Sequence, residues 1–127
     1  MSEEKLHIKN IPGASEIYKQ LGNWPIFHDS EVAAINLIRN GPSSLHIVSP
    51  VNSFTSEHLQ RWCICLQFSE IVEIELVDFN HQNVLYDLTF TLKDNLYSVN
   101  IDSSFGVDGF ITAKTLLFKM SEFPFEK

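Results

Sequence analysis

Glycine, proline and cysteine are scarce in this chain of 127 residues, which holds five, five and two of them. This scarcity, with no internal repeat or low-complexity tract, excludes a collagen-like or disordered chain. Two cysteines are too few for the disulfide framework of a small secreted domain. Cys63 and Cys65 stand two positions apart on one side of an expected strand, where a bridge between them would be strained. Both are therefore expected to be buried or half-buried free thiols.

Long apolar runs are missing as well. No segment approaches the ~20 consecutive apolar residues that a membrane-spanning helix needs. The first ten residues, MSEEKLHIKN, are charged and lack the apolar centre of a signal peptide. These absences predict a cytoplasmic protein. The length suits a single domain over residues 1–127, because a chain of this size can bury one core.

Basic residues are few: nine lysines and arginines stand against 16 aspartates and glutamates, for a net charge of −7. Residues 70–108 hold eight of the acids and one base, Lys93. This balance disfavours nucleic acid and anionic membranes, which bind basic surfaces. It suits a basic protein partner attracted over long range, although a face that only keeps the protein soluble stays open. The candidate partner-binding acids are Glu73, Glu75, Asp78, Asp87 and Asp102.

Alternating apolar and polar residues dominate the chain from residue 31 onward, and a helical pattern precedes them. Residues 14–21 predict a short helix, with Ser15 as its cap and Gly22 as its stop. Period-two alternation predicts strands with one buried face; in residues 71–79, Val72 and Ile74 are expected inside and Glu73 outside. The predicted strands span 31–40, 45–49, 61–68, 71–79, 83–94, 96–102 and 110–120.

Short turns join most of these strands, and short turns require antiparallel neighbours. The sequence therefore predicts an α+β fold that is mainly antiparallel β. A short N-terminal helix precedes about seven strands over residues 31–120, arranged as one twisted sheet or a two-layer meander. Antiparallel sheets with free edges can self-associate, so a homodimer stays open.

Sequence motifs of catalysis are missing: the chain holds no glycine-rich phosphate loop, HExxH, CxxC pair or GxSxG. The pair His28-Asp29 is the one combination with chemical potential. With Glu31 it offers three polar groups just before a strand, which is the basis for a metal-dependent enzyme or a small-ligand-binding domain. His46, His58 and His81 are scattered and are expected at the surface.

A structural role for this segment is the favoured interpretation. Trp24 and Phe27 would anchor a turn in the core, and Pro25 would stiffen it. Asp29 or Ser30 would then bind exposed backbone N–H groups where the strand begins. His28 is expected to hydrogen-bond to neighbours in the sequence. This interpretation requires no cofactor and no metal.

The stretch WPIFHDSEV resembles the N-terminal signature of the immunity protein 50 family, W-P-x-F-H-D-x-E followed by V or I. The matching residues are Trp24, Pro25, Phe27, His28, Asp29, Glu31 and Val32. A glycine-rich turn over 106–111 that leads into a final strand is also similar. The resemblance implies a small cytoplasmic bacterial protein without catalytic activity, which binds and neutralises a toxin of a polymorphic secretion system. A basic nuclease would suit the acidic middle segment.

Overall fold

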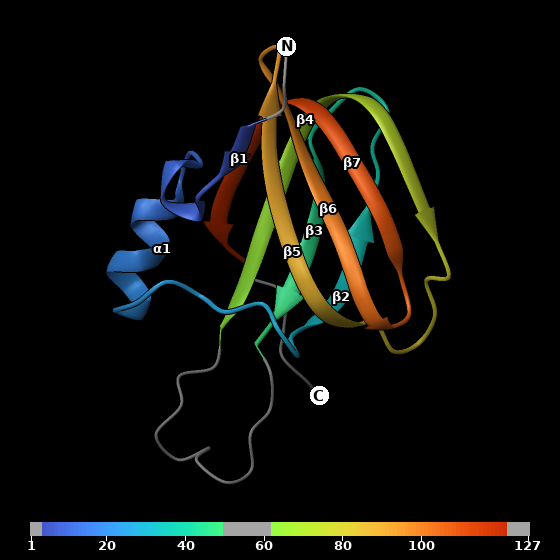
Figure 1. The fold of residues 1–127 in the computed structure, drawn as a ribbon, viewed down its shortest axis with the longest axis horizontal. Coiled ribbons are helices and arrows are strands. Elements are labelled where there is room, and N and C mark those ends of the chain that lie inside the picture. The colour runs from blue at the N-terminus through green and yellow to red at the C-terminus, as the bar shows by residue number, and fades with distance from the viewer. Residues whose placement is uncertain (1–3, 50–61, 122–127) are drawn as a thin grey trace, which may run out of the picture.

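In residues 4–49 and 62–121, which the computed structural model describes, seven antiparallel strands form one sheet (Figure 1). This confirms the α+β class with mainly antiparallel strands. The strands are β1 Glu4–Leu6, β2 Glu31–Asn36, β3 Ser43–Val48, β4 Cys63–Val77, β5 Val84–Lys93, β6 Leu96–Phe105 and β7 Asp108–Met120.

The sheet closes on itself, because β5 pairs with strands on both of its sides. The ring runs β5-β2-β3-β4-β7-β6 and returns to β5. The contact between β2 and β5 is short, with Glu31 opposite Val84, whereas β6 pairs along the whole of β5. Strand β1 pairs with β5 on the same side as β2, further along the strand, where Leu6 lies opposite Phe90. Of the two predicted arrangements, one twisted sheet or a two-layer meander, the structure confirms the single sheet and shows that it is closed.

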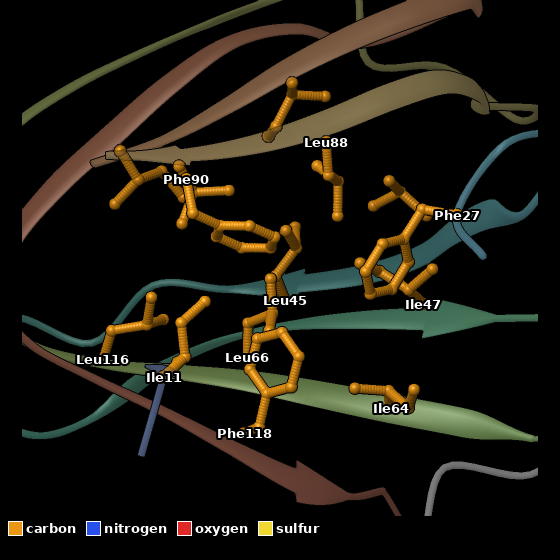
Figure 2. Packing of buried hydrophobic residues seen from close by; sticks show 14 of the residues in the cluster. Ile11, Phe27, Leu45, Ile47, Ile64, Leu66, Leu88, Phe90, Leu116 and Phe118 are labelled. Carbon is orange, nitrogen blue, oxygen red and sulfur yellow. The ribbon is translucent and has the colours of Figure 1, made fainter. Parts of the chain in front are cut away.

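The core fills the inside of this ring with aliphatic and aromatic side chains from every strand of the ring (Figure 2). Phe27, which precedes β2, makes edge-on contacts with Trp62, Phe90 and Phe118 at centroid distances of 6.0, 6.3 and 6.4 Å. Edge-to-face aromatic contacts of this kind stabilise beyond the area that they bury. Phe27 therefore belongs to the core rather than to a surface turn.

The predicted helix is present as α1, Ala14–Leu21, and packs outside the ring against β7. Gly22 ends it with a left-handed φ of 82°, as expected. The prediction that Ser15 caps the helix is wrong, because the N-cap is Gly13 and Ser15 lies within the first turn. A side chain at Gly13 would collide with the carbonyl oxygen of Phe118, so the helix start lies directly on β7.

Two predicted strands, 61–68 and 71–79, form the single long strand β4. No turn separates them; the phase of alternation changes instead at a bulge between Ile71 and Glu73. The expected burial of Val72 and Ile74 is wrong, since their side chains are 51% and 38% exposed. The seventh strand is β1, which the alternation did not indicate because it is only three residues long.

Bulges also change the phase at the start of β5, between Val84 and Asp87. Tyr86, expected on the same side as Leu88, is exposed, whereas Leu85 is buried. The turn after β5 agrees with its sequence: Asp94 and Asn95 both adopt positive φ, as a two-residue hairpin turn requires.

Candidate functional site

The segment of residues 24–32, called here the closing segment, joins β2 to β5 and so closes the sheet. The backbone N–H of Asp29 donates to the Leu85 carbonyl at 2.8 Å, and the Leu85 N–H donates to the Ser30 carbonyl at 2.8 Å. The N–H of Val32 donates to the carbonyl of Asn83 at 2.9 Å. These bonds continue the ladder past the single residue pair of β2 and β5.

The polar side chains of the closing segment bind backbone on either side of this seam. His28 Nδ1 lies 2.9 Å from the Tyr86 carbonyl oxygen, and its ring meets the Tyr86 ring edge-on. Glu31 Oε2 accepts from the Asn83 N–H at 3.4 Å. Ser30, fully buried, donates its hydroxyl to the Phe27 carbonyl at 2.5 Å.

Several details differ from the sequence-based interpretation. In the closing segment, the carboxylate that accepts a backbone N–H is that of Glu31. Asp29 Oδ2 instead lies 3.6 Å from His28 Nε2. His28 bonds to a residue 58 positions away rather than to its neighbours in the sequence. Trp24 is only partly buried and makes a tilted ring contact with Tyr18 of α1, at a centroid distance of 4.6 Å and an interplanar angle of 53°.

Asn83, which the sequence analysis did not single out, is the polar centre of this end of the molecule. Its side chain is buried, and its Oδ1 accepts from the N–H groups of Asn80 (3.1 Å) and Val107 (3.0 Å). Its Nδ2 donates to the Asn80 carbonyl at 2.7 Å. Gly106, with φ +102°, leaves room for it, since a Cβ there would lie 2.6 Å from Asn83 Oδ1. Asn83 thus ties two loops to the closing segment.

His28, Asp29 and Glu31 do not converge on a common point that would hold a metal ion. His28 and Asp29 are exposed beside each other, while the Glu31 carboxylate is bound to the Asn83 backbone. Within the described residues, no group of three His, Cys, Asp or Glu side chains is placed as a metal site. What the closing segment does show is a set of backbone hydrogen bonds that join β2 to β5.

Four of the candidate acids lie on β4, β5 and β6, the fifth directly follows β4, and all five are exposed. Glu73 and Glu75 lie on β4, opposite Thr112 and Phe110 of β7. Asp87 of β5 lies directly opposite Asp102 of β6, and β7 separates β6 from β4. Asp78, with φ 66°, follows the end of β4. We call the outer surface that carries Glu73, Glu75, Asp78, Asp87 and Asp102 the acidic face.

A second polar row crosses the outside of the ring at β3, β4 and β7. His46, Cys65 and Lys119 are cross-strand neighbours there, and His46 Nδ1 lies 2.8 Å from the Ser121 hydroxyl. Burial, helped by Lys119, lowers the pKa of His46. His46 is half-buried rather than a plain surface residue, whereas His81 is exposed as expected. His58 lies outside the described residues.

Both thiols are free and buried on this outer side of β4, as the sequence predicted. Burial raises the pKa of Cys63 and of Cys65. A raised pKa lowers the fraction of thiolate, which is the form that attacks electrophiles and binds metals. The row is consequently poorly suited to nucleophilic chemistry.

The fold and this geometry define a small α+β protein whose polar signature closes an antiparallel sheet and whose candidate acids are exposed. None of the helices in the described part of the chain is long and apolar enough to cross a membrane. The chain belongs to the immunity protein 50 family, whose model matches residues 13–123. Searches of curated proteins and of solved structures gave no match.

Family membership confirms the resemblance that the closing segment carries, and it makes this chain an immunity protein. The family places it among proteins that neutralise a cognate toxin by binding it, generally without catalysis.

Proposed function

We propose that the protein neutralises its cognate toxin by binding a basic surface of that toxin, such as the active-site surface of a nuclease, through the acidic face. An inhibitor of this kind needs no reaction, only a complementary surface of roughly 800 Å² per partner. Carboxylates arranged along strands can occupy the positions at which a nuclease binds phosphates. The same charges would accelerate association by long-range attraction.

The observation that carries this proposal is the direct cross-strand pair of Asp87 and Asp102. Like charges opposite each other on one face of a sheet destabilise it. No lysine or arginine lies opposite either residue in the β5–β6 register, and Glu73 and Glu75 lie across β7 on the same outer surface. A basic partner would relieve this repulsion, so the arrangement favours binding over a role in stability.

Co-purification with the toxin encoded next to the gene tests the proposal. Reversal of charge in Glu75→Lys or Asp102→Lys should weaken the affinity by about 10- to 100-fold, a cost of about 1.4–2.8 kcal/mol. The association rate of the unaltered protein should fall as salt is added. Glu16→Lys, on the exposed side of α1, is the matched control and should bind normally. Normal binding by all face variants would remove the acidic face from the interface.

A further inference from the structure

The second half of β4 has a free edge. Strand β3 pairs with β4 only as far as the Ser43–Phe68 pair, whereas β7 continues to pair with β4 up to Val77. Within the described residues, no strand pairs with residues 71–77 of β4 on the side away from β7. Figure 1 shows this arrow end of β4 (yellow-green) beside β7 and clear of the other strands. We call this side of residues 71–77 the open edge.

An apolar groove runs beside the open edge, where the turn between β2 and β3 separates from β4. It has a volume of about 420 Å³, with Leu37 and Ile38 on the turn side and Ile71 and Ile74 on the strand side. Leu37 and Ile38 are 55% and 47% exposed, and Ile74 is 38% exposed. Apolar side chains that gather along an unpaired strand are the usual features of a surface that accepts an added strand.

Charge decides which segment fits this edge. Glu73 and Glu75 alternate with Ile74 along it and are exposed, while Glu70 at its start is already paired with Lys114 at 3.5 Å. The open edge therefore offers two carboxylates that form no ion pair with any other described residue, next to an apolar groove. Arg39 lies across the groove on the turn side, not on the strand.

A second copy of this chain fits poorly. Antiparallel pairing of two open edges about Ile74 would place Glu73 of one copy opposite Glu75 of the other, at both ends of the contact. Like charges directly opposite are destabilising. Lysine or arginine at alternating positions of a partner strand would instead lie opposite these glutamates.

We propose that the open edge binds an extended segment of a partner protein as an added strand, and that this segment alternates basic and apolar residues. Backbone hydrogen bonds to β4 would hold the segment, Glu73 and Glu75 would bind its basic side chains, and the groove would receive its apolar ones. The inference rests on the proposed function in taking the toxin as the donor of this segment. It adds the edge of β4 as a second contact with the toxin, besides the pair Asp87 and Asp102 of the acidic face.

A synthetic peptide of four Lys-Val repeats, capped at both ends, is the probe, and backbone amide NMR of the whole chain at 150 mM salt is the measurement. We expect shift changes and slower hydrogen exchange confined to residues 71–77 and 37–41. A Glu-Val peptide of equal length should not bind. Ile74→Lys should weaken peptide binding by about tenfold or more, because it fills the groove and repels the probe.

Glu75→Lys is the second variant. It should also weaken binding, because it replaces a carboxylate that binds the basic side chains of the peptide with a positive charge. The position is exposed and tolerates the substitution. The matched control is Asp87→Lys combined with Asp102→Lys, which should leave peptide affinity within about threefold. Equal binding of both peptides, unchanged binding by the β4 variants, or shifts centred on β5 and β6 would overturn the inference. Edge shifts that depend on protein concentration without peptide would also overturn it, in favour of a second copy.

Toxin binding separates this inference from the proposed function. If Ile74→Lys loses the peptide but binds the toxin as tightly as the unaltered protein, the toxin is not the donor of the strand, and the acidic face remains the toxin site. If no toxin binds the unaltered protein while the peptide binds at the edge, the proposed function is wrong and the strand-binding edge stands.

Discussion

Asn83 shows how much one buried polar side chain contributes at the seam of the sheet. Its side chain accepts hydrogen bonds from backbone N–H groups of both loops beside it. The Glu31 carboxylate accepts from the Asn83 N–H, and the Val32 N–H donates to the Asn83 carbonyl. In the sequence it stands in the polar run NHQN and has the appearance of an ordinary turn residue. Only the fold brings Val107 and Glu31 to it. An asparagine between turn residues and the first apolar residue of a strand is too weak a signal to identify such a centre.

Asn83→Ala should lower the free energy of unfolding by roughly 1–3 kcal/mol, because it leaves the N–H groups of Asn80 and Val107 without their acceptor. Urea unfolding followed by tryptophan fluorescence measures the change. Gln82→Ala, at the exposed neighbouring position, is the control and should stay within about 0.5 kcal/mol of the unaltered protein. Equal stability of the two variants would contradict the role of Asn83.

At the scale of the element, the strands differ from their sequence patterns wherever a bulge changes the phase. Alternation placed Val72 and Ile74 inside, but the bulge between Ile71 and Glu73 and the free edge leave both exposed. Bulges depend on register with the neighbouring strand, which alternation within one strand does not contain. Helix α1 and the turn at Asp94 and Asn95 were predictable because their signals are local.

The strand pair β5–β6 carries a repulsion that a single substitution can remove. Asp102→Asn should stabilise the protein by roughly 0.2–1 kcal/mol, since Asp87 then faces a neutral side chain. Thermal unfolding at low and high salt measures it, and the gain should shrink as salt screens the pair. In an Asp87→Asn background the same substitution should give no further gain. A gain that persists there would mean that repulsion between this pair is not its source.

For the whole molecule, closure of the sheet depends on the closing segment, which inserts Phe27 into the core and bonds β2 to β5. Phe27 is 7% exposed, while its neighbour Ile26 is 73% exposed. Removal of the buried Phe27 side chain leaves a cavity that the closed sheet cannot fill, because hydrogen bonds fix the spacing of its strands.

Phe27→Ala should therefore cost about 3–5 kcal/mol of unfolding free energy, as deletions of buried aromatic side chains do. Ile26→Ala, one position away, should change stability by less than about 0.5 kcal/mol. Chemical unfolding of the two variants side by side gives the comparison. A small cost at Phe27 would show that the seam is held by its hydrogen bonds alone.

The sequence by itself determined the class of the fold, the helix, the buried thiols and the family, because each rests on local patterns: periodicity, turn residues and the stretch from Trp24 to Val32. Tertiary structure alone decided that the sheet closes, that this stretch is its seam, and that Asp87 faces Asp102. It also decided that β4 keeps an open edge beside an apolar groove. These features depend on which strands become neighbours and in what register, and the energy of that choice lies in contacts between residues far apart in the chain.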